Sequence, residues 1–462
     1  MTIEIQEARV LLEQNGQAQV LTHWDRLNDA GKKTLFGQIA DLDFKAIGRM
    51  KESLKHAAGG ALHTDIEPAE VIAASEAQMP KIRKCGEDAI RAGTVAVVLV
   101  AGGQGSRLGF EGPKGAYLIG PVSRAPLFAF HARKILALEQ KYNAKVPFYI
   151  MTSETNDAET RAFFKEHRWF GLAEDRVCFF KQGMWPALWP DGKLVMDRPD
   201  HLFMSPDGHG GILRALEQSG SMADMDRRGI RTVFYFQVDN PLVEIAEPGF
   251  IGMHLERRAD VSVKVCAKRN AQEGLGVVVR RGTRCAVVEY TELTDAQKRE
   301  TLPDGRLRLL YGSVAIHVFD VGFLKREIQR DMPLHTAHKK VPFCGDDGRT
   351  VQPDKPNAFK FEKFIFDVIP DADRAINVEF AREDEFAPVK NASGDDSPAT
   401  CEAALSAKFA RWLEACGVKV PRRTDGVPTV KIEIDPAYAL GPDDLRQRLP
   451  KGFGVKGDVL LK

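Results

Sequence analysis

Apolar and polar positions follow different periods in different parts of the chain. Up to residue 92, apolar residues recur three or four apart, as at Leu35 and Ile39, which predicts amphipathic helices. From Val95 onward, short apolar runs alternate with helix-length amphipathic segments. We therefore predict an N-terminal helical region (1–92), a central α/β domain (93–385) and a small C-terminal α+β domain (386–462).

The central part of the chain alternates strands and helices. Strands are predicted at 95–101, 146–153, 176–181 and 232–238, and helices at 126–142, 157–167 and 210–219, with further short strands at 261–267, 276–281, 285–290 and 312–320. This order is typical of a three-layer domain with a mixed, mostly parallel sheet. Asn156 is a plausible N-cap of the second helix. The C-terminal part shows a helix near 403–415 and a strand near 429–434.

The first predicted strand ends in a glycine-rich loop. Six apolar residues at 96–101 indicate a strand buried on both faces, and three of the next four residues are glycines. Glycines let the backbone approach a ligand closely, and peptide N–H groups outside regular structure can bind anionic oxygens. Arg107 and Lys114 add positive charge to this loop. The pattern predicts a ligand rich in phosphate.

Two well-known phosphate loops do not fit this segment. The dinucleotide fingerprint G-x-G-x-x-G fails because Gly109 comes one residue too late, and the Walker A pattern fails because Lys114 is followed by Gly115. A plain glycine-rich turn is the bland alternative. The preceding buried strand and the Pro113-Lys114 pair favour a phosphate loop over that alternative.

Composition narrows the class of protein. The 462 residues are 44% hydrophobic and 28% charged with a net charge of +1, which argues against a dedicated binder of nucleic acid or acidic membrane. No run reaches the length of a membrane span, and the first residues lack the apolar core of a signal peptide. Seven scattered cysteines without a C-x-x-C pair fit a reducing compartment. We expect a cytoplasmic soluble protein.

Asp239 follows the predicted strand at 232–238 directly. In a parallel sheet this places a carboxylate at the edge that also carries the glycine-rich loop. Mg²⁺ typically binds one or two carboxylates together with phosphate oxygens and water. A turn aspartate is the structural alternative, because Asp-Asn-Pro is a turn-like sequence. Beside a phosphate loop, the metal interpretation is favoured.

Several segments resemble one family. Residues 101–109 read A-G-G-Q-G-S-R-L-G and are followed by Pro113-Lys114, and residues 382–391 read R-E-D-E-F-A-P-V-K-N. These are similar to signature segments of the eukaryotic-type UDP-sugar pyrophosphorylases, and most similar to those of UDP-N-acetylhexosamine pyrophosphorylases. The resemblance implies a nucleotide-diphospho-sugar transferase-like (GT-A-like) fold. It implies Mg²⁺-dependent reaction of UTP with a sugar 1-phosphate, most simply N-acetylglucosamine 1-phosphate.

The resemblance also implies roles for individual residues. Lys390 is expected to meet the sugar phosphate, Asp239 to hold the metal, and Gln182 to read the uracil edge. The full set comprises catalytic Arg107, Lys114 and Lys390, substrate-binding Ala101, Gly102, Gly103, Gly105, Gln182, Gly208, His209, Gly276, Glu289, Ser313, Phe364 and Phe366, and metal-binding Asp239.

Two positions depart from the family pattern. His209 and Ser313 stand where the family has asparagines that contact the sugar, which leaves glucose or galactose 1-phosphate as alternatives. Phe364 and Phe366 favour an N-acetyl group if they line the sugar pocket, although by spacing alone they would be core residues of a strand. More distant alternatives are a nucleotide-sugar-dependent glycosyltransferase and a non-catalytic nucleotide-sugar sensor.

Overall fold

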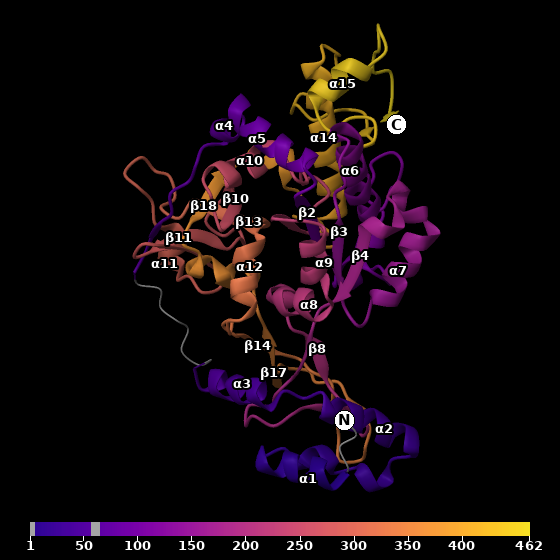
Figure 1. Cartoon of the computed structure of the whole chain (residues 1–462), viewed down its shortest axis with the longest axis vertical. Coiled ribbons are helices and arrows are strands. Elements are labelled where there is room, and N and C mark those ends of the chain that lie inside the picture. The colour runs from indigo at the N-terminus through magenta and orange to yellow at the C-terminus, as the bar shows by residue number, and fades with distance from the viewer. Residues whose placement is uncertain (1–4, 57–64) are drawn as a thin grey trace. The chain divides into compact units, whose positions relative to one another are not determined.

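The structure is a computed structural model that describes residues 5–56 and 65–462. The chain forms two compact units. Unit 1 comprises Met1–Leu62, Gln182–Ile212 and Asp331–Asp367, and unit 2 comprises His63–Lys181, Leu213–Arg330 and Val368–Lys462. Figure 1 shows the elements of both units along the colour-graded chain. Each unit is described by itself below.

Unit 2 is built on a ten-stranded sheet in the order β1-β11-β13-β9-β2-β3-β4, with β10, β12 and β18 attached to it. Strands β9, β2, β3 and β4 pair in parallel, and β1, β12 and β13 run against the other strands. This confirms the predicted mixed, mostly parallel sheet. The bounds are β1 Ile66–Pro68, β2 Val95–Val100, β3 Phe148–Thr152, β4 Val177–Lys181, β9 Thr232–Gln237, β10 Val261–Ala267, β11 Val277–Arg281, β12 Arg284–Val288, β13 Tyr311–Asp320 and β18 Ala375–Glu379.

Helices cover both faces of this sheet, as the three-layer prediction requires. Side chains alternate along β3, because successive residues of a strand point to opposite faces. Phe148 and Ile150 join the core beneath one helical layer, whereas the hydroxyl of Tyr149 donates to Asp224 in the other layer. The helices of unit 2 are α4 Ala74–Ala77, α5 Pro80–Arg91, α6 Leu127–Tyr142, α7 Asp157–Glu166, α8 Ile212–Gln218 (which begins at the last residue of unit 1), α9 Ser221–Arg227, α10 Pro248–Glu256, α11 Asp295–Arg299, α12 Val321–Ile328, α13 Arg382–Glu385, α14 Pro398–Ala415 and α15 Pro442–Arg448.

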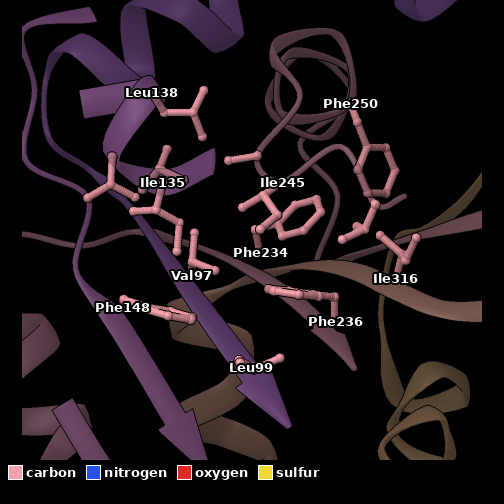
Figure 2. Close-up of a cluster of buried hydrophobic side chains, with 14 of the residues drawn as sticks. Val97, Leu99, Ile135, Leu138, Phe148, Phe234, Phe236, Ile245, Phe250 and Ile316 are labelled. Carbon is pink, nitrogen blue, oxygen red and sulfur yellow. The ribbon is translucent and has the colours of Figure 1, made fainter. Parts of the chain in front are cut away.

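The largest core lies between the sheet and the layer formed by α5, α6, α7 and α10. Figure 2 shows strand residues Val97 and Phe234 facing Ile135 and Leu138 of α6 and Phe250 of α10. These side chains are at most 4% exposed. Because each fully buried large apolar side chain contributes about 1.5–3 kcal/mol, this core fixes the strand ends on which the loops described below depend.

Helices α5 and α10 touch backbone to backbone. A Cβ at Gly86 would lie 1.9 Å from the carbonyl oxygen of Pro248, and one at Gly252 would lie 1.8 Å from that of Ile82. No side chain fits at either position, so both glycines are required by the close approach. This contact holds α5 against the sheet-covering layer.

The C-terminal residues belong to unit 2 and pack on α6. After α14, the short strands β19 (Ile432–Ile434) and β20 (Val459–Leu461) pair in parallel. Glu433 is 2% exposed, and its carboxylate accepts hydrogen bonds from the backbone N–H groups of Val122 and Ser123 at 2.9 and 2.8 Å. Arg133 of α6 pairs with Asp435 at 2.6 Å.

Unit 1 joins the N-terminal helices to two later stretches of chain. Its helices are α1 Ile5–Gln14, α2 Asp29–Ala40 and α3 Phe44–His56, with 3-10 turns at Ala18–Leu21 and Trp24–Arg26 where continuous amphipathic spacing was predicted. Four short strand pairs complete it: β5 (Met184–Pro186) with β8 (Met204–Pro206), β6 (Met196–Arg198) with β7 (His201–Leu202), β14 (His335–Lys339) with β17 (Ala358–Glu362), and β15 (Phe343–Cys344) with β16 (Thr350–Val351).

The two units do not follow the boundaries predicted from the sequence. Residues 65–92 belong to unit 2, where β1 pairs with β11, and residues 182–212 and 331–367 leave the predicted central domain to pack with the N-terminal helices. In unit 1 a single core contains Leu12 and Leu35 of the helices together with Leu188 and Phe361. No described helix is long and apolar enough to cross a membrane.

Candidate active site

The loop after β2 is fixed through its carbonyl groups. Asn156 donates from Nδ2 to the carbonyl oxygens of Ala101 and Gly103 at 2.9 and 3.3 Å, and the hydroxyl of Ser153 donates to that of Gly102 at 2.8 Å. Asn156 occupies the N-cap position of α7, as the sequence predicted, but its side chain makes no capping hydrogen bond. The oxygen that a cap would use, Oδ1, instead accepts from the backbone N–H of Ser153 at 2.8 Å.

With these carbonyls held, the loop presents N–H groups. Among the described residues, the N–H groups of Gly102 and Gly103 have no acceptor, whereas that of Gly105 donates to the carbonyl of Gly112 at 2.9 Å. Two neighbouring free N–H groups at the end of a parallel strand form a site suited to an anion. Gly109 closes the following 3-10 turn, Ser106–Leu108, with φ at 68°. The free N–H groups of the loop are therefore consistent with the predicted binding of phosphate.

None of the three cations predicted to be catalytic has a carboxylate partner among the described residues. Arg107, Lys114 and Lys390 form no ion pair with any carboxylate in the part of the chain that the structure describes. Arg107 is exposed, and Lys114 and Lys390 are half-buried. The backbone N–H of Lys114 donates to the carbonyl of Gly103 at 3.1 Å, which attaches this residue to the loop.

Backbone hydrogen bonds bring Asp239 and Lys390 to the same edge of the sheet as the loop. The N–H of Val238 donates to the carbonyl of Val100 at 3.0 Å, since β9 and β2 are parallel neighbours. The N–H of Val389 donates to the carbonyl of Asp239 at 2.8 Å. The metal-binding candidate therefore lies between the β2 loop and the segment that carries Lys390.

The side chain of Asp239 fits a cation site. It is 9% exposed, and no described residue donates a hydrogen bond to its carboxylate or pairs with it. A buried carboxylate without a partner is costly, so a cation is the natural complement. No cluster of three potential protein ligands occurs among the described residues. One carboxylate completed by phosphate oxygens and water is the pattern expected of Mg²⁺ rather than of a zinc site.

The loop that follows Asp239 is held by donors from α6. His131 Nε2 lies 2.9 Å from the carbonyl oxygen of Val238. One turn later, Lys134 donates to the carbonyl oxygens of Pro241 and Val243, the latter at 2.7 Å. Burial lowers the pKa of His131 to about 3, so its imidazole is neutral and donates from Nε2.

A second lysine joins the same loop to the segment before Lys390. Lys408 of α14 is 4% exposed and donates to the carbonyl oxygens of Leu242 at 3.3 Å and Asp384 at 2.5 Å. It also pairs with Glu244 at 3.1 Å. Its ammonium group thus connects residues 242–244 to residue 384.

Glu385 and Lys264 complete this network. Their side chains, 5% and 3% exposed, form an ion pair, and the second oxygen of Glu385 accepts from the N–H of Glu244 at 3.3 Å. Asn240 donates to the carbonyl of Glu385 at 2.7 Å and accepts from the N–H of Ala387 at 3.2 Å. Burial raises the pKa of Glu385 to about 6, against the opposing effect of Lys264. Sequence reasoning missed all of these positioning residues.

Gly276, Glu289 and Ser313 gather where β11, β12 and β13 meet in unit 2. The N–H of Ser313 donates to the carbonyl of Gly276 at 2.8 Å. A Cβ at Gly276 would lie 3.3 Å from Oε1 of Glu289. The structure therefore brings these three predicted sugar-binding residues together, as a group separate in sequence from the loop.

The other predicted substrate-binding residues fall in unit 1. Gln182 is 9% exposed beside Gly183, and Gly208 has φ at 84° with a Cβ position 2.5 Å from the carbonyl oxygen of Lys363. His209 stacks on Phe364 with ring centroids 5.1 Å apart. Unit 1 thus holds the residue predicted to read uracil and part of the predicted sugar-binding set, and unit 2 holds the rest of that set together with the cations and Asp239.

His209 has a defined tautomer. Its Nδ1 accepts a hydrogen bond from the N–H of Ile365 at 3.1 Å, which leaves the proton on Nε2. Burial, with a smaller effect of His335, lowers the pKa of His209 to about 4. The family asparagine offers an amide donor, and a neutral imidazole Nε2–H is also a donor.

Phe364 and Phe366 do not lie on a strand, so that alternative is wrong. Strand β17 ends at Glu362, and a 3-10 helix, Ile365–Asp371, begins two residues after Lys363. The two rings are 5.2 Å apart, and Phe364 also stacks on His335, whose Nε2 lies 2.9 Å from Asp367. The bend at the start of the 3-10 helix places both rings beside His209 and His335. The alternate spacing of the two phenylalanines, which is typical of a strand, did not predict this arrangement.

The chain is similar to known proteins over most of its length. The chain matches the family described as UTP–glucose-1-phosphate uridylyltransferase over residues 60–439. It is 34% identical to the UDP-N-acetylglucosamine pyrophosphorylase of Saccharomyces cerevisiae, covering 99% of this chain and 100% of that protein. It is 35% identical to the human UDP-N-acetylhexosamine pyrophosphorylase-like protein 1, covering 95% and 94% of the two chains.

Solved structures give the same result. The uridine diphosphate N-acetylglucosamine pyrophosphorylase of Trypanosoma brucei, solved in complex with an inhibitor, is similar with a TM-score of 0.82 and 28% identity. That similarity covers 95% of this chain and 94% of the other. The family expected from the loop and from residues 382–391 is therefore confirmed. The chain belongs to the UTP–glucose-1-phosphate uridylyltransferase (UDPGP) family of UDP-sugar pyrophosphorylases.

Proposed function

We propose that this protein transfers the uridylyl group of UTP to N-acetylglucosamine 1-phosphate, forming UDP-N-acetylglucosamine and pyrophosphate. The observation that carries the proposal is the near full-length similarity to the yeast protein of that activity by name, 34% identical over 99% of this chain. The edge of the sheet in unit 2 supports it, because free N–H groups, three unpaired cations and a lone buried carboxylate suit a nucleoside triphosphate.

The residues of unit 2 have roles that follow from the reaction. Both substrates are anionic, so catalysis consists of positioning and of neutralising charge, without a covalent protein intermediate. Arg107 and Lys114 bind the β- and γ-phosphates and stabilise the departing pyrophosphate. Lys390 orients the phosphate of the sugar for in-line attack on the α-phosphorus. Asp239 holds Mg²⁺, which when bound supplies further charge neutralisation at the phosphate oxygens.

Glucose 1-phosphate is the second candidate substrate, with galactose 1-phosphate as a further variant. The family that matches residues 60–439 is described by glucose 1-phosphate, and His209 and Ser313 differ from the asparagines expected of an N-acetylhexosamine enzyme. Against it, the named relatives at 34–35% identity act on N-acetylglucosamine or N-acetylhexosamine by name. A donor is retained at position 209, which favours the first candidate.

The test is pyrophosphate release from UTP and Mg²⁺ with N-acetylglucosamine, N-acetylgalactosamine, glucose or galactose 1-phosphate, each with and without EDTA. We expect the highest kcat/KM with N-acetylglucosamine 1-phosphate and loss of activity with EDTA. A higher kcat/KM with glucose 1-phosphate would replace the first candidate by the second. No pyrophosphate with any sugar would favour the glycosyltransferase or sensor alternatives. Cytoplasmic location stays a prediction that fractionation of cells tests directly.

A further inference from the structure

A cavity of about 460 Å³ lies within unit 2, next to the loop that follows Asp239. Its walls come from α6, from residues 241–248, from α14 and from residues 434–444. We call it the α6–α14 cavity. Its volume is in the range of small-molecule sites, about 300–1,000 Å³. None of the cations or glycines assigned above to UTP lines it.

The walls are largely apolar. Aromatic and aliphatic side chains from α6 and α14 face the space, together with Ile245 of the loop. They include Phe130, Leu138, Tyr142, Leu405 and Phe409. Apolar side chains next to charged groups are typical of sites for organic ligands rather than for inorganic ions.

The charged groups of the cavity leave one cation without a carboxylate partner. Arg83 pairs with Glu247 at 2.6 Å and Lys141 with Asp444 at 2.8 Å. Lys408 pairs with Glu244 at 3.1 Å, and Asp443 pairs with Arg446 outside the cavity at 2.8 Å.

Lys134 is the remaining charged residue of the lining, and it has no ion pair within the part of the chain that the structure describes. Its ammonium donates to the carbonyl oxygens of Pro241 and Val243, and an ammonium has three N–H groups. Burial, and secondarily Lys408, lowers the pKa of Lys134 to about 7. An anion beside it would reverse that effect. The cavity therefore combines an apolar volume with one cation that has no carboxylate partner and one N–H group left to donate.

We propose that the α6–α14 cavity binds an amphipathic organic anion whose apolar part fills the space between the two helices and whose acid group accepts a hydrogen bond from Lys134. Such a ligand bonds the same ammonium that holds the carbonyls of Pro241 and Val243, two and four residues after Asp239. Binding of the ligand thereby changes the hydrogen bonds that hold the loop after Asp239. The effect of the ligand on catalysis rests on the proposed function, whereas its binding to the cavity does not.

The binding test uses 1-naphthaleneacetate and its neutral analogue 1-naphthaleneacetamide, each titrated into the full chain by calorimetry. A hydrogen bond to a charged group is worth about tenfold to a hundredfold in affinity, so we expect the acid to bind one-to-one and at least tenfold more tightly than the amide. Lys134→Met removes that preference. Lys141→Met, which removes a cation already paired with Asp444, keeps it.

Two results of these titrations would overturn the proposed site. One is the absence of saturable binding of the acid. The other is an unchanged preference for the acid in Lys134→Met. Because that variant could misfold, a second measurement uses the unaltered protein: trace acetylation with acetic anhydride, read by peptide mass spectrometry. Saturating acid protects Lys134 and leaves Lys141 unchanged. Equal labelling of Lys134 with and without the acid places binding elsewhere and rejects the proposal.

The coupling has its own measurement. Saturating 1-naphthaleneacetate lowers kcat for pyrophosphate release in the unaltered protein and in Lys141→Met, but not in Lys134→Met. Binding with unchanged kcat rejects the coupling and retains the site. A chain that releases no pyrophosphate with any sugar 1-phosphate rejects the proposed function, while the calorimetric result still decides the site. Self-association that excludes the acid, detected by sedimentation velocity, would instead assign the cavity to a second copy and overturn the proposal.

Discussion

Two sets of cations in unit 2 use the same residue types in opposite ways. The edge cations, Arg107 and Lys114 with Lys390, have no carboxylate partner among the described residues and lie on or next to the two loops at the sheet edge. The network lysines, Lys264 and Lys408, pair with carboxylates of the protein itself.

Whether a cation has a partner within the protein indicates whether it binds a ligand or positions other parts of the chain. A cation that the fold leaves uncompensated is available for a ligand of opposite charge, whereas a cation compensated within the protein fixes the segments it bonds. Removing an edge cation is therefore expected to lower activity without lowering stability. Removing a network lysine leaves buried acceptors without partners and is expected to lower stability.

The largest effect is expected for Lys264→Met. Glu385 would remain buried without its partner, which typically costs about 3–5 kcal/mol of unfolding free energy. Lys325→Met serves as control, because its pair with Asp226 is exposed and should cost less than about 1 kcal/mol. Urea denaturation measures both variants. An equal loss of unfolding free energy in the two variants would contradict the positioning role of the network lysines.

Lys114→Ala and Lys390→Ala test the edge cations. Loss of one preorganised charge in phosphoryl transfer typically lowers the rate by about 10²–10³. We expect that loss in kcat/KM for pyrophosphate release, with a melting temperature within the error of the unaltered protein. Lys81→Ala, at an exposed ion pair with Glu256, should change neither quantity. Near-normal turnover of either edge variant would remove its catalytic role.

A third prediction concerns His131, the neutral side chain that donates to the carbonyl of Val238. A histidine whose folded pKa of about 3 lies below its unfolded value of about 6.5 binds fewer protons in the folded state, so its contribution to stability rises with pH between those values. His131→Gln removes this titration. Between pH 5 and 6.5 the unfolding free energy of the unaltered protein should rise by about 1.5 kcal/mol relative to the variant. Parallel pH profiles of the two proteins would contradict the prediction.

The smallest effect is expected for Asn156→Ala. The variant loses the bonds to the carbonyls of Ala101 and Gly103 that turn the loop N–H groups outward. One or two neutral hydrogen bonds contribute about 1 kcal/mol, so kcat/KM should fall by roughly five- to tenfold. The KM for UTP is expected to carry most of the change. An effect on stability alone would make Asn156 a structural residue and not a positioning one.

The sequence predicted the part of the fold with strong local signals. The apolar run at 96–101 and its glycines indicated β2 and the phosphate loop, because a buried parallel strand has a continuous apolar pattern. The predicted strands and helices between Val95 and Asp320 have counterparts at nearly the same residues. Asp239 was found for the same reason, since the end of a parallel strand is a fixed place in the sheet.

The remainder depends on contacts between distant residues. Lys264 and Glu385 are 121 residues apart, and no local pattern distinguishes such a pair from two surface charges. Unit 1 contains strands of two to five residues at 184–206 and 335–362, too short to show a period. Phe364 and Phe366 alternate as in a strand, yet the chain bends into a 3-10 helix there.

Glu433 has a consequence for how the chain is made. Its carboxylate bonds the N–H groups of Val122 and Ser123 in the turn that leads into α6, more than three hundred residues earlier. During synthesis that turn leaves the ribosome long before residue 433 does. Unit 2 therefore cannot complete its structure until residue 433 has been synthesised, and a nascent chain halted before β19 would expose the apolar face of α6 to chaperones and proteases.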